Sequence, residues 1–269
     1  MNNLTISIFN YHVEYIEKLN PNAQKTIVFV HGFTSNFELF EPVAQHLSEY
    51  NYYALNLPGH GNTLENEIQD FDLLKYADLL LEFIKLKKLK NVHAIGHSMG
   101  GGVCSFAIAK EPEHFAKLIL VAPWNKTSQQ TGWATYFYFF PKSLKDFYQL
   151  VLKYQFDFDF NDYTKIKQVI NWIRLINSNT LRAIGYRVLG PSMLTNFLID
   201  KIDQATKKLQ LPVLLVYGDR DFIINVSAIK QYYQANVSNL TIKVFPNTGH
   251  KPWSNNLIPF VNLIKTYFD

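Results

Sequence analysis

The chain contains the sequence Asn-Val-His-Ala-Ile-Gly-His-Ser-Met-Gly-Gly-Gly-Val at residues 91–103. Its first five residues are typical of a short buried strand, and the residues after Ser98 are typical of a closely packed helix. Between them lies the pattern Gly-x-Ser-x-Gly, in which side chains at Gly96 or Gly100 would collide with the adjoining strand and helix. The pattern therefore predicts a sharp strand-to-helix turn with the Ser98 hydroxyl exposed at its tip.

Two later segments contain the residue types that activate a serine. A serine hydroxyl becomes nucleophilic when a base takes its proton, and the base needs an acid that orients it. A buried strand over 211–217 runs into Gly218-Asp219-Arg220-Asp221, and a late strand runs into Gly249-His250. We interpret His250 as the candidate base and one of the two aspartates as the candidate acid.

A third segment predicts a pair of backbone donors. A tetrahedral intermediate has a negative oxygen, which two preorganised N–H groups stabilise. The residue after the serine, Met99, supplies one such group. The strand Val28-Phe29-Val30 ends in His31-Gly32-Phe33, where the glycine lets the backbone turn, so we expect the N–H of Phe33 to be the second.

Together with Leu57-Pro58-Gly59-His60-Gly61, these motifs make the chain similar to the α/β-hydrolases of the lipase/esterase type. The resemblance covers nearly the whole chain except its middle. In that family the order Ser, Asp, His along the chain is the expected one. The resemblance implies that Ser98 is the nucleophile, His250 the general base and Asp221 its partner.

The resemblance also settles how the neighbouring residues are interpreted. The family's Gly-x-x-Asp pattern favours Asp221 over Asp219, which then shapes its loop. Phe33 and Met99 supply the oxyanion hole. His31 and Gly32 support the oxyanion loop, and His31 is expected to hydrogen-bond that loop and not to act as the base.

Composition limits the kind of protein. At 269 residues, 48% hydrophobic and 18% charged, the chain can fold around one large core with an inserted subdomain. No apolar run reaches the length of a membrane span, and residues 1–7 do not resemble a signal peptide, so a cytoplasmic location is expected. The net charge is +4, and we interpret the basic run 85–90 as the solvated end of a helix. A weak peripheral contact with anionic lipid is the second interpretation of that run, and no motif predicts nucleic-acid binding.

Neither a metal nor an organic cofactor is expected. The eight histidines show no ligand clustering, because His93 and His97 straddle the end of a strand and do not share a helical face. The single cysteine, Cys104, rules out an internal disulfide framework and is interpreted as a small buried packing residue.

Strands alternating with helices predict a wound α/β fold with an eight-stranded, mostly parallel sheet flanked by helices. The first two strands are more polar and are expected to form an antiparallel edge. We predict strands near 4–8, 11–16, 26–30, 52–56, 92–96, 117–122, 213–217 and 240–245. We predict helices near 38–49, 72–89, 99–110, 225–236 and 256–268.

The middle of the chain has a different pattern, with helical periodicity and no strand signal. We predict a core formed by 1–123 and 206–269, with a helical cap at 124–205 inserted between the sixth and seventh strands. The cap is rich in aromatic residues, and a third of them could line an apolar pocket while the rest form the cap's own core. These residues are Trp133, Tyr136, Phe137, Tyr138, Phe139, Phe140, Phe147, Tyr148, Tyr154, Phe156, Phe158, Phe160 and Tyr163.

The function expected from these observations is hydrolysis of carboxylic esters with apolar acyl groups. Small-molecule apolar esters are then the expected partners. Within the same fold, the alternatives are a thioesterase, a C–C bond hydrolase and an aminopeptidase-like enzyme. A receptor or scaffold is the non-enzymatic alternative, which the retention of all the motifs disfavours.

Overall fold

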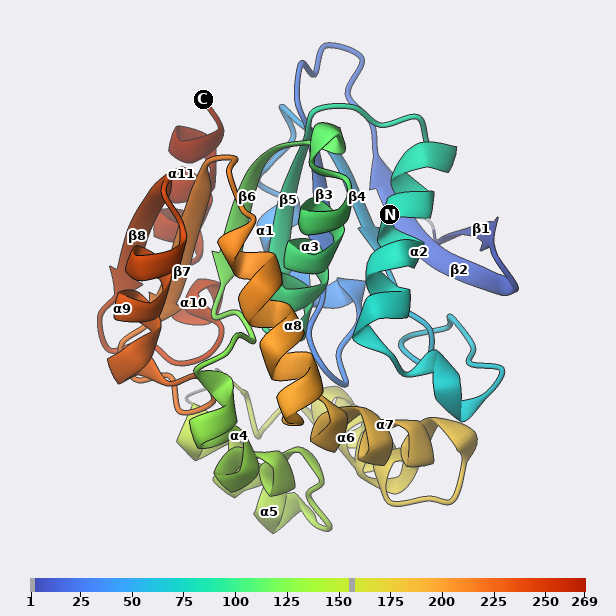
Figure 1. Ribbon diagram of the computed structural model, residues 1–269. Coiled ribbons are helices and arrows are strands. Elements are labelled where there is room, and N and C mark those ends of the chain that lie inside the picture. Colours follow the sequence, from blue (N-terminus) through green and yellow to red (C-terminus); the bar gives the residue numbers. More distant parts are fainter. Residues whose placement is uncertain (1–2, 155–157) are drawn as a thin grey trace.

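The computed structural model describes residues 3–154 and 158–269, and eight strands in it form one sheet (Figure 1). The order across the sheet is β1-β2-β4-β3-β5-β6-β7-β8. β2 pairs antiparallel with both β1 and β4, and every other neighbouring pair is parallel. All eight predicted strands and the antiparallel edge are confirmed. The strands are β1 Leu4–Ile8, β2 Tyr11–Lys18, β3 Thr26–Val30, β4 Asn51–Leu55, β5 Val92–His97, β6 Phe115–Val121, β7 Val213–Gly218 and β8 Leu240–Phe245.

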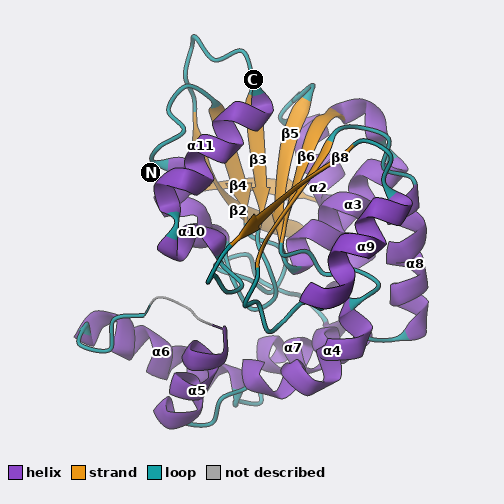
Figure 2. Ribbon diagram, turned by 90° about the vertical axis from the view of Figure 1, so that its left-hand side faces the viewer, coloured by secondary structure: helices purple, strands orange, loops and turns teal. Residues whose placement is uncertain are grey.

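Helices cover both faces of the sheet (Figure 2). Successive residues of a strand point to opposite faces, and β3 shows this alternation directly. Val28 and Val30 pack with α2 Leu73–Leu86, α3 Met99–Lys110, α8 Asn196–Lys207 and α9 Val226–Asn236. Ile27 and Phe29 pack on the other face with α1 Glu41–Ala44, α10 Pro252–Asn255 and α11 Leu257–Phe268. Burial on both faces explains why the central strands are continuous apolar runs.

The predicted helix over 38–49 is wrong as a single helix. The structure has a 3-10 turn, η1 Phe37–Phe40, and then the one-turn helix α1. An α-helix through this point would need an N–H from residue 42 to the carbonyl of Glu38, and Pro42 has none. The apolar spacing that suggested a helix is real, because Phe37, Phe40 and Leu47 are all buried against the sheet. The other four predicted helices are confirmed, with ends shifted by up to three residues.

The described part of the segment 124–205 contains α4 Ser128–Tyr136, η4 Phe137–Phe139, α5 Leu144–Tyr154, α6 Tyr163–Ile176, α7 Leu181–Ser192 and α8. Helices α4 to α7 lie below the carboxyl ends of the strands in Figures 1 and 2, whereas α8 runs along α3 on the sheet layer. α5 and α6 share a small hydrophobic cluster of their own that includes Phe147, Leu150 and Ile173.

Polar contacts join α7 to the loop that follows β4. Arg182 donates to the Gly61 carbonyl at 2.8 Å and pairs with Glu65 at 2.9 Å, and both side chains are largely buried. The Tyr186 hydroxyl donates to the Gly59 carbonyl at 2.7 Å. The motif Leu57–Gly61 therefore holds α7 in place at the strand ends.

Candidate active site

Ser98 lies between β5 and α3 in a strained backbone conformation, with φ 53° and ψ −121°. A non-glycine residue in this region needs tight surroundings to hold it there. A Cβ at Gly96 would come within 2.5 Å of the Gly100 carbonyl oxygen, and a Cβ at Gly100 would collide with the Val30 carbonyl. The two glycines therefore let strand and helix approach closely enough to force the turn that the sequence predicts.

Asp221 and His250 form a buried hydrogen-bonded pair. His250 Nδ1 donates to Asp221 Oδ2 at 2.7 Å, and the two side chains are 4% and 0% exposed. The other carboxylate oxygen, Oδ1, accepts the backbone N–H of Ile223 at 2.8 Å. In the part of the chain that the structure describes, the Asp219 carboxylate accepts one hydrogen bond, from the backbone N–H of Thr248 at 3.3 Å. The structure thus brings the Asp221 carboxylate to the imidazole of His250. The Asp219 carboxylate instead contacts the backbone of the loop that leads to His250.

Ser98 and His250 line one cavity together with His97. Within residues 3–154 and 158–269, the Ser98 hydroxyl makes no hydrogen bond to the imidazole. Free enzymes often have long catalytic hydrogen bonds that shorten only when substrate binds. His97 Nε2 donates to the His250 carbonyl at 2.9 Å, which fixes the backbone beside the imidazole. Burial holds the pKa of His97 well below its usual range, so His97 is neutral in this contact.

The backbone N–H groups of Phe33 and Met99 donate to no acceptor in the described part of the chain. Both residues line a cavity with Ser98. A Cβ built on Gly32 would lie 3.1 Å from Ser98 Cβ, so the loop before Phe33 passes close to the serine. Two free donors beside a serine match the arrangement that stabilises an oxyanion.

His31 bridges two loops. Its Nε2 accepts the N–H of Leu57 at 3.1 Å, so Nδ1 carries the proton and donates to the Gly32 carbonyl at 2.8 Å. Burial lowers the pKa of His31 to about 4, which keeps it neutral at pH 7. The His60 ring packs on it at 4.8 Å between centroids. His31 thus hydrogen-bonds the loop it precedes. Its other partner is the Leu57–Gly61 motif, which no pattern in the sequence around His31 indicates.

Two cavities meet at Ser98. The first, a narrow cavity of about 60 Å³, lies between the strand ends and helices α4 and α7, and none of the described residues that line it is charged. Its walls include Phe33, Trp124, Tyr136, Phe139, Met193 and Leu194. The second is wider and more open, and it adds the polar side chains of Glu38, Lys165, Gln168 and Lys251 to Phe139, Phe147, Phe158 and Trp172. Burial lowers the pKa of the Lys251 amine to about 8.

The described aromatic side chains between residues 133 and 163 divide into three groups. Tyr136, Phe139, Phe147 and Phe158 line the cavities. Tyr138 and Phe160 pack in or against the α5–α6 cluster, and Phe140 packs against the main core. Trp133, Phe137, Tyr148 and Tyr163 are exposed. Phe156 and the side chain of Tyr154 lie outside what the structure describes.

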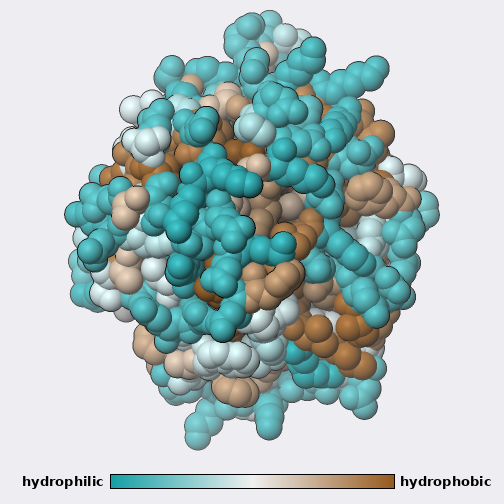
Figure 3. Space-filling model, viewed as in Figure 1, coloured by the Kyte–Doolittle hydropathy of each residue, from teal (hydrophilic) through white to brown (hydrophobic). Residues whose placement is uncertain are grey.

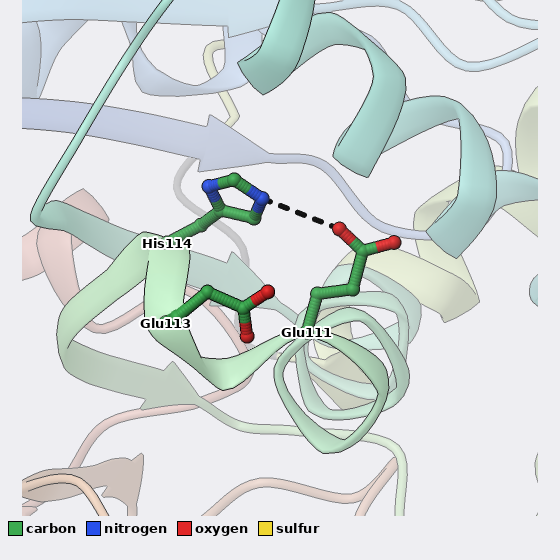
Figure 4. A group of neighbouring side chains, drawn as sticks. All are labelled: Glu111, Glu113 and His114. Atoms are coloured by element: carbon green, nitrogen blue, oxygen red, sulfur yellow. Dashed lines mark ion pairs between the residues drawn. The ribbon is translucent and has the colours of Figure 1, made fainter.

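Figure 4 shows the single group of three potential metal ligands among the described residues, Glu111, Glu113 and His114. Glu111 already pairs with Lys85 at 2.8 Å and with His114 at 3.2 Å. The group follows the C-terminal end of α3, whereas Ser98 precedes the N-terminal end. It therefore lies away from the candidate site, and no part of the chemistry there depends on it.

Comparison with known proteins identifies the class. A family model described as alpha/beta hydrolase fold matches residues 25–253, so the chain belongs to the α/β-hydrolase family. Two mycoplasma proteins, both named "Putative esterase/lipase 2", match most of the chain. The one from Mycoplasma pneumoniae is 27% identical, over 84% of this chain and 82% of its own length. The one from Mycoplasma genitalium is 28% identical, over 93% and 91%.

A solved structure shares the fold. The crystal structure of a "putative lipase (lip1)" from Acinetobacter baumannii superposes with a TM-score of 0.82 at 20% identity, covering 99% of this chain and 92% of that one. The chain is therefore an esterase/lipase-like α/β-hydrolase. In the described residues, no helix has both the length and the apolar character to cross a membrane.

Proposed function

We propose that this protein hydrolyses carboxylic esters with apolar acyl groups through an acyl-enzyme on Ser98. The proposal rests on three features that lie together. They are a serine with a strained backbone, two backbone N–H groups that donate to no acceptor in the described residues, and a cavity with no charged residue among its described lining. The buried Asp221–His250 pair lies in the same place.

In the first half of the reaction, Ser98 attacks the ester carbonyl while His250 Nε2 takes the hydroxyl proton. The carbonyl oxygen becomes negative and accepts hydrogen bonds from the N–H groups of Phe33 and Met99. Asp221 stabilises the imidazolium through Nδ1. The carbon–oxygen bond to the alcohol then breaks, and the imidazolium gives its proton to the leaving alcohol.

In the second half, a water molecule attacks the acyl-enzyme and His250 takes its proton. The same two N–H groups stabilise the second tetrahedral oxygen, and the proton returns to Ser98 as the acid leaves.

We assign the acyl group to the first cavity, because charged or strongly polar acyl groups would lose hydration there without compensation. The alcohol then faces the wider, more polar cavity. Helices α4 to α7 of the segment 124–205 act as the cap that sets this choice, whereas α8 packs on the sheet layer. A cytoplasmic location stays a prediction.

The test is a series of soluble esters from acetate to decanoate, with kcat/KM measured for the parent protein and for Ser98→Ala. We expect kcat/KM to rise a few-fold for each methylene, at up to about 0.8 kcal/mol each, until the cavity is full. Ser98→Ala should lose activity on the order of 10⁴-fold, and a fluorophosphonate probe should label only the parent protein. A Ser98→Ala variant that turns over at the parent rate would refute the mechanism. A flat chain-length profile would refute only the assignment of the acyl cavity.

A further inference from the structure

The helices and turns of residues 124–205 expose many large apolar side chains. Sixteen such side chains are exposed in the described part of the chain, and nine of them fall within residues 124–205, which make up less than a third of the sequence. Phe137 is 71% exposed and Tyr163 is 80% exposed. The full set is Trp133, Phe137, Leu144, Tyr148, Leu152, Tyr163, Ile184, Val188 and Phe197. Exposed apolar residues that are grouped in this way mark interaction surfaces.

Several of these side chains are four residues apart, so they lie on the same side of their helix and form a continuous exposed face. Trp133 and Phe137 are four residues apart, as are Ile184 and Val188. On α5, Leu144, Tyr148 and Leu152 fall within an arc of about 80°, at about 100° per residue. The adjoining side of α5 is buried through Phe147, Leu150 and Val151. α5 therefore has a second apolar face that nothing in the described chain covers.

Positive charge accompanies the apolar faces. Residues 124–205 contain ten Lys and Arg against six Asp and no Glu, whereas the rest of the chain contains 16 residues of each sign. The whole net charge of +4 therefore belongs to this segment. Lys145 lies just beyond the edge of the apolar arc of α5, Lys142 precedes that helix, and both are exposed.

The apolar faces share one end of the molecule. Helices α4, α5 and α7 all lie at the lower end in Figures 1 and 2. Figure 3 shows brown and pale surfaces across that end, interrupted by hydrophilic side chains. Both cavities at Ser98 lie between these helices and the strand ends.

We propose that the exposed apolar faces of α4, η4, α5 and α7 dock on a lipid bilayer that contains anionic headgroups. Lysines beside exposed aromatic and aliphatic side chains are the combination that binds the interface of an anionic membrane. Aromatic side chains such as Trp133 and Tyr148 are favoured at the boundary between headgroups and hydrocarbon. A second copy of the chain fits less well, because two surfaces that each carry a +4 segment repel one another.

The test is co-sedimentation of the full chain with vesicles. One set contains phosphatidylcholine alone, and the other contains equal amounts of phosphatidylcholine and phosphatidylglycerol. We expect binding to the second set, weakened by salt. Lys142→Gln with Lys145→Gln should lower the association constant about fivefold per lysine. Phe137→Ser should lower it by about tenfold, because the ring no longer enters the interface.

The matched controls lie in the basic run at the end of α2. Lys88→Gln with Lys90→Gln removes two exposed lysines, and Leu86→Ser removes an exposed apolar side chain. All variants should keep the parent melting temperature and the parent rate on a soluble short ester, since none of these residues lines a cavity at Ser98.

Three results would overturn the proposal. One is the absence of binding to the anionic vesicles, and another is an equal loss of binding in the control variants. The third is a concentration-dependent dimer that Phe137→Ser dissociates, which would mean that a second copy covers the surface. None of these results bears on ester hydrolysis, which the soluble esters test separately.

Discussion

Replacing Asp221 by Asn tests the candidate site most sharply, because the structure predicts which way the new amide turns. Asp221 Oδ1 accepts backbone N–H groups from Ile223 at 2.8 Å and Ile224 at 3.3 Å. An amide oxygen can keep both of these bonds, but an amide NH₂ in that place would be repelled by both donors. The amide oxygen of the Asp221→Asn variant therefore stays where Oδ1 lies, and the amide NH₂ replaces Oδ2.

The NH₂ group then faces His250 Nδ1, which donates to Oδ2 at 2.7 Å in the parent protein. Two donors cannot share this contact, so the imidazole moves its proton to Nε2 and presents Nδ1 as an acceptor. An Nε2 that holds a proton cannot take one from Ser98. The expected loss in kcat is on the order of 10⁴-fold, the scale associated with a wrong tautomer in a serine–histidine–aspartate site.

The assay is kcat and KM on the best soluble ester for the parent protein, Asp221→Asn and Asp219→Asn. Asp219 makes one long bond to the Thr248 N–H, which an amide oxygen can also accept, so its variant should lose less than about tenfold. KM should change little in both variants, since neither residue lines a cavity at Ser98. A larger loss in Asp219→Asn than in Asp221→Asn would show that the wrong carboxylate is assigned.

The acyl cavity, a buried ion pair and two buried histidines can be tested in the same way. Met193→Ala enlarges the acyl cavity, so the ester with the highest kcat/KM should become longer by roughly two methylenes, and an unchanged optimum would mean that the acyl chain lies elsewhere. Arg182→Gln leaves Glu65 largely buried and unpaired, so urea unfolding should show a loss of about 3 kcal/mol in unfolding free energy, while the double variant with Glu65→Gln should recover part of it. Burial lowers the pKa of His31 and of His93 to about 4, whereas a histidine in an unfolded chain has a pKa of about 6.5. The unfolded chain therefore binds protons first as the pH falls, so the contribution of these histidines to the free energy of unfolding is complete above pH 6.5 and is lost toward pH 4. Urea unfolding should therefore show a falling free energy of unfolding between pH 7 and pH 4.5, less steeply in His93→Gln, and equal slopes for the two proteins would contradict the pKa of His93.

The strands were predictable because their signal is local. The buried parallel strands β3 and β6 contain the unbroken apolar runs 27–30 and 118–121. The glycines around Ser98 let the helix and the strand approach closely, which predicts the turn between them. The same kind of reasoning is wrong at residues 38–49. There the apolar spacing predicts one helix, although Pro42 cannot supply the hydrogen bond that such a helix needs.

Chain order and local pattern thus determined the α/β fold, its antiparallel edge and a short set of candidate residues. These features depend on hydrogen bonding and apolar periodicity within single elements, which neighbouring residues control. The contacts between residues that are distant in the sequence depend on the tertiary structure. Asp219 and Asp221 lie in one loop, and the family pattern favours the second. The contact itself depends on the approach of the loop at Gly249-His250, which brings the imidazole to Asp221.

The cavities and the exposed faces are likewise tertiary features. Phe139 lines a cavity and Phe137 faces outward, although the two are separated by one residue in one aromatic run. Aromatic content alone could not separate them, because the direction of each side chain depends on how η4 packs between α4 and α5. Burial is a property of what lies on top of a residue, and in this protein the covering elements come from distant parts of the chain.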